Sequence, residues 1–342
     1  MYNFNSGYGQ ALFQMICSRV PALGKVYVVL DPDDTDEQNY AMLNQIFKPD
    51  PDGSVRIFSK NSSAGVTPLE QAYAACESNN NDVIILDGNS THLVTTGLAW
   101  TKNRIHVFGM DGGNRLTQQG VKIELTGAVD SAYVLKVTGV RNSFRNLKVI
   151  QSSTHANALN VIQYAGEGNL YENVSCIFGV IDNLGLTTSA EALMGEDAGT
   201  FINCSWGTDV LLTSDARRVM AFDAITGGSA DGAKSNRFVD CEWIIMSSDA
   251  NAVLLKIVDI GGAKFLNQLI RPRFIAVKST GGGGIAITNA VQSVASFVDG
   301  SLVLFWPVTA NCTNGCDTLT ANVVIGGAPV FGAGTWEGGT PT

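Results

Sequence analysis

The chain has 342 residues, of which 45% are hydrophobic and only 15% charged, so its composition excludes an intrinsically disordered protein. Its formal net charge of −9 argues against a nucleic-acid partner, because contacts to phosphates require clustered Lys and Arg. No segment reaches the roughly 18 consecutive apolar residues that a membrane span requires. The first residues also lack the basic and apolar regions of a secretory signal, which predicts folding in a reducing cytoplasm.

The first 66 residues predict an arm and a small unit. Residues 1–24 are apolar and aromatic without a long period, which is typical of an arm that docks on its own domain or on a partner. Residues 25–66 are expected to form a β-α-β unit with parallel strands at 25–30 and 55–58. The helix between the strands is expected at about 36–47, where apolar residues recur at helical spacing.

Residues 67–80 carry the clearest local signal, a capping helix. Thr67 is placed as the N-cap, Pro68 occupies the first helical position, and Glu70 completes a capping box. Leu69, Ala72, Tyr73 and Cys76 then form one apolar face, and strands are expected at 82–88 and 105–109.

Residues 81–306 contain a repeat in which an aromatic residue is followed, two positions later, by Asn or Asp. Intervals of 27 to 37 residues between the aromatics predict a solenoid, and a right-handed parallel β-helix fits best. Stacked coils would place the aromatics in a buried column and the Asn or Asp in amide ladders or turn caps. The Gly-rich residues 307–342 are expected to be a cap and tail. The six repeats begin at Phe144, Tyr171, Phe201, Phe238, Phe265 and Phe297.

The order of a capping helix, a strand ending in Asp87-Gly88, the turn Lys102-Asn103 and the strand Ile105–Gly109 resembles the opening of pectin-lyase-like β-helices. The wider pattern, including Arg141–Asn146 and Asp231–Cys241, is similar to β-helix virion proteins of tailed bacteriophages. That resemblance implies a non-enzymatic component of a phage particle. It also implies virion proteins as partners, a homotrimer, and a location in the virion.

No residue set in the sequence has the pattern of a catalytic, cofactor or metal site. Enzymes of the pectin-lyase-like class, which the sequence resembles, use Asp pairs for hydrolysis, or Ca²⁺-binding Asp with an Arg or Lys base for elimination. Arg271-Pro272-Arg273 lacks the further Arg of the lyase motif and is expected to be a solvated edge feature. The sequence pattern places no Ser or Cys beside a histidine, so it does not predict a catalytic triad. The weighed acidic candidates are Glu191, Glu196, Asp197, Asp215 and Asp223, and the histidines are His92, His106 and His155. Glu196 and Asp197 are adjacent acids in a Gly-flanked turn and are expected to be only solvated.

The cysteines and glycines are given structural interpretations. Cys312 and Cys316 are expected to be free thiols or a local disulfide, because a metal site needs at least two more ligands. The glycine runs at 109–113 and 281–284 lack the features of phosphate loops and are expected to be turns.

The sequence therefore predicts a non-enzymatic virion component without cofactor or metal. Two alternatives stay open. The first is a polysaccharide lyase or hydrolase that acts on a host-surface glycan, and the second is a glycan-binding adhesin with an aromatic strip outside the coils. Trp206 and Trp243 could serve such a strip, since they could face either way.

Overall fold

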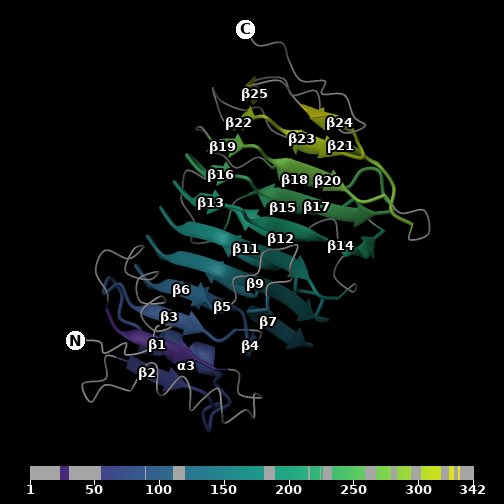
Figure 1. The fold of residues 1–342 in the computed structure, drawn as a ribbon. Helices are drawn as coiled ribbons and strands as arrows, with labels where there is room; N and C mark the ends of the chain where they lie inside the picture. Colours follow the sequence, from purple (N-terminus) through teal and green to yellow (C-terminus); the bar gives the residue numbers. More distant parts are fainter. Residues whose placement is uncertain are drawn as a thin grey trace.

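The computed structural model shows a right-handed parallel β-helix, in which successive coils stack along one axis (Figure 1). It describes residues 24–30, 55–88, 90–110, 120–180, 189–214, 216–223, 225, 233–258, 267–278, 283–293, 302–316, 323–326 and 330–331. Every described strand pairing is parallel, as the repeat predicts. No helix among the described residues is long and apolar enough to cross a membrane.

Three faces surround the core, and we number them as sheets I to III. Sheets I and II join because β9 and β11 run through both. Sheet I contains, in spatial order, β2 (Val55–Phe58), β1 (Val26–Val29), β3 (Val83–Leu86), β6 (His106–Gly109), β9 (Ser143–Ser153), β11 (Leu170–Phe178), β13 (Thr200–Ile202), β16 (Arg237–Val239), β19 (Asn267–Ile270), β22 (Leu302–Phe305) and β25 (Val323–Gly326). Sheet II contains β4 (Thr91–Leu93), β7 (Lys122–Gly127), the second halves of β9 and β11, β14 (Ser205–Thr213), β17 (Glu242–Ser247), β20 (Arg273–Ala276), β23 (Val308–Ala310) and β26 (Val330–Phe331). Sheet III contains β5 (Leu98–Trp100), β8 (Leu135–Val137), β10 (Asn160–Tyr164), β12 (Ala190–Met194), β15 (Arg218–Phe222), β18 (Val253–Ile257), β21 (Ile287–Ser293) and β24 (Cys312–Cys316).

The N-terminal end is closed by helix α3 (Pro68–Ala75), and the predicted capping box is present. The Thr67 side chain accepts a hydrogen bond from the Glu70 amide, while the Glu70 carboxylate accepts one from the Thr67 amide at 2.9 Å. At the other end of the helix, Lys102 Nζ donates to the carbonyls of Tyr73, Ala74 and Cys76 at 2.7–2.8 Å, where the helix dipole favours a cation. Strand β1 lies between β2 and β3, so these strands belong to the β-helix. The helix expected at 36–47 lies outside the described residues.

A column of stacked rings runs through the core, as the repeat predicts for its first four members. Tyr171 and Phe201 are nearly parallel with centroids 4.7 Å apart, and Phe201 and Phe238 are 4.6 Å apart. Trp206 and Trp243 form a second column and are fully buried, so neither contributes to an outer aromatic strip. Sheet II begins after a bend, and the inward side of its strands carries these indoles.

The last two predicted repeats are out of register. Leu269 and Leu304 continue the ring column after Phe238, whereas Phe265 and Phe297 lie outside the described residues. The aromatic-x-Asn pattern gives the wrong register for the coil of Phe265, because Asn267 belongs to a buried column of amides and lies two positions before the core residue Leu269. The strands also continue past residue 306 with β23 and β24, which extends the coils beyond the expected start of the cap.

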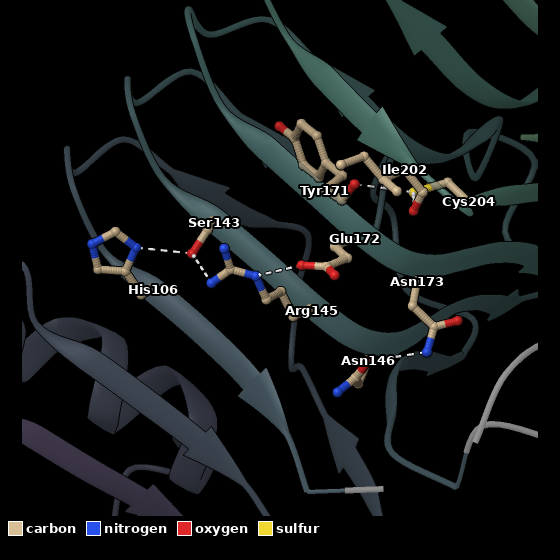
Figure 2. Close-up of polar contacts among 9 residues, drawn as sticks. All are labelled: His106, Ser143, Arg145, Asn146, Tyr171, Glu172, Asn173, Ile202 and Cys204. Atoms are coloured by element: carbon tan, nitrogen blue, oxygen red, sulfur yellow. Dashed lines mark hydrogen bonds and ion pairs between the residues drawn. The ribbon is translucent and has the colours of Figure 1, made fainter. Parts of the chain in front are cut away.

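The Asn or Asp of the first four repeats forms the bend between sheets I and II. Asn146, Asn173, Asn203 and Asp240 all have φ between 52° and 56°, the left-handed conformation that Asn and Asp tolerate better than most residues. The turn-cap interpretation is therefore confirmed for these four residues. The Asn173 side chain also donates to that of Asn146 at 3.0 Å (Figure 2).

A buried amide ladder lies at the preceding turn, two positions before the ring column. The side chains of Asn142, Asn169 and Asn267 accept backbone N–H groups from the neighbouring coil at 2.7–3.1 Å. In the coil of Phe201 this position is Gly199, and the Glu196 carboxylate takes the place of the amide. A Cβ at Gly199 would lie 2.9 Å from the Glu196 carboxyl carbon, so only glycine leaves room for this replacement.

Candidate functional site

A row of polar side chains runs along the outer side of sheet II, one from each coil. Inward residues alternate with outward ones along each strand, so the inward Val149, Cys176 and Trp206 fix the outward direction of their neighbours. We call this set the polar row. Its members, paired coil by coil, are Lys122, Lys148, Ser175, Ser205, Glu242 and Arg273.

Two lysines stand side by side in the row. Lys122 and Lys148 are direct partners on adjacent strands and both are half-buried. Burial and the neighbouring charge of Lys122 lower the pKa of Lys148 below its usual value, and Asp209 opposes this shift. Asp209 follows Thr208 at an irregularity in the pairing of β14 with β17. At a given pH, the fraction of Lys148 that is neutral and able to accept a proton is therefore larger than for an ordinary lysine.

The rest of the row is joined by short polar contacts. The hydroxyl oxygens of Ser175 and Ser205 are 2.8 Å apart, and Arg273 Nη2 lies 3.0 Å from Glu242 Oε1. Beside the lysines, the Ser152 hydroxyl donates to the Glu124 carboxylate. Ser175, Ser205 and Glu242 are buried, so Lys122, Lys148 and Arg273 are the members of the row that solvent reaches. The two lysines combine a neutralisable amine with an ammonium group, a set that can bind an anionic group and abstract a proton.

The acidic residues weighed from the sequence do not form a catalytic pair. Glu191 is fully buried and bound to Arg217, and Glu196 is fully buried in the turn ladder. Asp197 pairs with Lys234 at 3.2 Å, and Asp223 with Arg218 at 3.5 Å. Asp215 lies outside the described residues. None of these contacts resembles the two facing carboxylates of a glycoside hydrolase.

Arg271 and Arg273, the pair weighed against the lyase motif, are both exposed and each binds an acidic residue one coil earlier. Two hydrogen bonds of 2.6 Å join the Arg271 guanidinium to Asp240, and they lower the pKa of that carboxyl group. The expected solvent exposure is therefore confirmed for both arginines, but Arg273 is not at a sheet edge, because β20 pairs with both β17 and β23.

One histidine does have a serine beside it, which sequence logic missed. His106 Nδ1 lies 2.8 Å from the Ser143 hydroxyl, and Arg145 Nη1 donates to the same oxygen at 3.4 Å (Figure 2). Burial and the Arg145 charge lower the His106 pKa to about 4, and Ser143 is only 4% exposed. A weak base and an inaccessible hydroxyl make this a buried polar cluster, which Glu172 completes by binding Arg145 at 2.9 Å. The pairing of β6 with β9 places His106 beside Ser143, and this register cannot be read from the sequence.

The other two histidines lie in different coils. His92 is buried in β4, and His155 is paired with Asp130 at 3.3 Å in a turn. Cys312 is a buried free thiol, so the local disulfide is not formed at that residue. The described residues hold no group of three or more His, Cys, Asp or Glu side chains arranged around a common metal position.

Glu196 predicts a pH dependence of stability. Burial raises its pKa to about 7 from an ordinary 4.5, so the folded chain binds the proton more tightly than the unfolded chain. Its stabilising contribution is full below pH 4.5 and is lost as the pH rises to about 7, a loss of roughly 3 kcal/mol. We expect Glu196→Gln to remove this loss, so that the variant gains stability relative to wild type between pH 5 and pH 8.

Urea unfolding at pH 5 and pH 8 measures this difference. Glu167→Gln, at an exposed carboxylate in the adjacent turn, is the control and should leave the pH dependence unchanged. An equal pH dependence in wild type and Glu196→Gln would show that the Glu196 carboxyl is not held protonated in the fold.

Comparison with known proteins gives structural neighbours only. No protein-family model matches the chain, and no curated protein matches it. Two solved structures of pectin methylesterase are similar in fold. One is a mutant bound to hexasaccharide IV, with 10% identity and a TM-score of 0.32, and the other is bound to hexasaccharide VII, with 11% and 0.35. Each comparison covers 87% of this chain and 92% of the other.

These neighbours agree with a pectin-lyase-like β-helix and correct one expectation. Both neighbours are enzymes, and this finding overturns the expectation that the protein is not an enzyme. Nothing in the comparisons supports a phage origin. The expected virion partners, trimeric state and virion location stay predictions.

Proposed function

We propose that the protein is a polysaccharide lyase that acts on uronate-containing glycans, with Lys148 as the general base. The observation that supports this proposal is the half-buried lysine pair, Lys122 and Lys148, on the outer side of sheet II. The chain is acidic overall, so a local pair of lysines is an unusual feature of its surface and favours an anionic ligand.

The chemistry follows from the two amines. Neutral Lys148 would remove the proton from the carbon next to the uronate carboxyl group, while the Lys122 ammonium would balance the negative charge that develops on that carboxylate. The electron pair then forms a carbon–carbon double bond as the glycosidic oxygen at the next carbon departs and takes a proton from water. The products are an unsaturated uronate end and a free sugar end.

The lysine pair also favours elimination over hydrolysis. Hydrolysis needs two carboxylates on either side of the scissile bond. The carboxylates weighed from the sequence are buried or bound to cations where the structure describes them. Elimination needs only one base and a positive charge near the carboxylate, which Lys148 and Lys122 can supply.

Lys148→Gln is expected to lower kcat by about 10²- to 10⁴-fold, the range typical of a lost general base. Lys122→Gln is expected to raise KM more than it lowers kcat, because Lys122 mainly holds the substrate carboxylate. The ultraviolet absorbance of unsaturated uronate, with alginate and polygalacturonate as substrates, measures both constants. The wild-type rate should rise with pH through a pKa below the ordinary lysine value of about 10.4.

Lys136→Met is the matched control, because Lys136 is also half-buried but lies on sheet III, away from the polar row. It should leave both constants unchanged. Full activity in Lys148→Gln would exclude Lys148 as the base. If neither polymer yields an unsaturated product, a panel of bacterial surface polysaccharides decides whether any uronate glycan is cleaved.

We also propose that this activity is carried on a phage particle, the location that the sequence resemblance implies, and that it is directed at a glycan of the host surface. Immunogold labelling of intact particles with an antibody against the chain tests the location, and mass measurement in solution tests the trimer. Absence of label on particles would remove the virion placement without affecting the lyase proposal.

A further inference from the structure

A second row of side chains borders the polar row. It consists of the bend residues between sheets I and II. Each lies two positions before a member of the polar row, except the last, which lies two positions before Val308 at the start of β23. We call it the bend ridge. Its members are Asn146, Asn173, Asn203, Asp240, Arg271 and Trp306.

The last ridge residue shares the left-handed conformation of the bend, but it is a residue type that this conformation does not favour. Trp306 has a φ of 49°, a left-handed value that costs a residue with a side chain of this size about 1–2 kcal/mol. It also precedes Pro307, which restricts its backbone further. The indole is 50% exposed, so its burial returns little of this cost. A strained and exposed aromatic residue at one position in a row of otherwise polar side chains indicates a binding role.

The neighbours of Trp306 suit a sugar. Phe305 lies beside the indole, with ring centroids 6.1 Å apart. One coil earlier, two hydrogen bonds of 2.6 Å to Asp240 orient the Arg271 guanidinium, which has further N–H donors available. Asn203 is exposed one coil before Asp240. An aromatic platform followed by fixed polar groups can hold the apolar face of a sugar ring and its hydroxyls.

We propose that Trp306 and Arg271 form a distal sugar-binding subsite for the same polysaccharide, which rests on the proposed lyase function. Trp306 stacks on a pyranose ring, and Arg271 and Asp240 bind its hydroxyl groups. The subsite lies five strand spacings from the coil of Lys148, roughly 24 Å along the axis. A long chain bound at the lysine pair therefore reaches Trp306, whereas a disaccharide bound at the lysine pair does not.

The test compares long and short ligands with one variant. Trp306→Asn places a residue that favours the left-handed bend, so the fold should keep or gain stability in urea unfolding. Binding of alginate and polygalacturonate, as polymers and as disaccharides, is measured by calorimetry on the complete chain with Lys148→Gln present to prevent cleavage. We expect polymer affinity to fall up to about tenfold and disaccharide affinity to stay unchanged.

Intrinsic fluorescence gives a second readout. Trp100, Trp206 and Trp243 are fully buried, and Trp336 lies outside the described residues. Comparison of wild type with Trp306→Asn therefore assigns the signal: polymer binding should alter the emission of wild type, and the change should disappear in Trp306→Asn. Trp306→Phe keeps a ring for stacking and should retain most of the polymer affinity.

The outcomes separate the two proposals. Unchanged polymer affinity in Trp306→Asn overturns the distal subsite even if Lys148 is the base. Loss of the polymer-induced fluorescence change in Trp306→Asn together with full activity in the single variant Lys148→Gln supports the subsite and overturns the assignment of the base. If the polymers do not bind to wild type, both proposals fail for uronate glycans.

Discussion

Phe201→Ala is expected to lower the free energy of unfolding by about 3–5 kcal/mol, the range for removing a large aromatic side chain from a packed core. Phe201 is fully buried and stacks between Tyr171 and Phe238, with centroid distances of 4.7 and 4.6 Å. It also meets Tyr164 and Trp206 edge-on, so five rings share one packing arrangement. Removing the central ring leaves a cavity that the rigid coils on either side cannot close. Urea unfolding monitored by circular dichroism measures the loss.

Phe305→Ala provides the matched control for Phe201→Ala. Phe305 belongs to sheet I as Phe201 does, but it points outward and is only half-buried. Its loss should cost less than half as much. Similar losses in the two variants would mean that the ring column is not the main source of stability in these coils.

Arg217→Met is also expected to cost about 3–5 kcal/mol, because it leaves the fully buried Glu191 carboxylate without its cation. Both side chains are only 1% exposed, and the Arg217 guanidinium lies 5.1 Å from the centre of the Phe178 ring. Burial raises the pKa of Glu191, while Arg217 opposes that shift, so the variant should have a still higher Glu191 pKa than wild type. Its stability should therefore fall more steeply with rising pH than that of wild type.

The double variant Glu191→Leu with Arg217→Met separates the effect of the charge pair on stability from the effect of side-chain packing. Replacing both charges by apolar side chains of similar size removes the cost of burying them, so its stability should return close to that of wild type or exceed it. Thermal unfolding of the two single variants and the double variant gives the coupling energy. A double variant as unstable as Arg217→Met alone would show that the pair has a role that apolar side chains cannot replace.

Much of the fold could be predicted from local patterns. Thr67-Pro68-Leu69-Glu70 defines a helix start by itself, and the run from Val83 to Leu86 is a buried strand in any register. The ring column was predictable at Phe144 to Phe238 because those coils keep the same offset between ring and bend. The prediction failed at Phe265 because Asn occurs in both the bend and the amide ladder, and the pattern cannot distinguish the two.

The candidate site was not predictable, because it depends on register. Lys122 and Lys148 are each ordinary outward residues of an alternating strand, and only the pairing of β7 with β9 makes them neighbours. Likewise, Glu196 was read as a solvated turn residue, although the absence of a side chain at Gly199 draws it into the ladder. Trp306 carries no sequence signal, since Asn or Asp was the expected bend residue.

The stacking of coils has a consequence for how the molecule unfolds. Each coil contacts only the coils before and after it, so its stability is a sum of nearest-neighbour terms, as in a one-dimensional Ising chain. Local unfolding can then spread from a weakened interface while the remaining coils stay folded. Hydrogen exchange of the amides would show groups of adjacent coils that open together, instead of one global unfolding transition. A polymer bound from Lys148 to Trp306 would link six successive coils and raise the cooperativity of that whole segment.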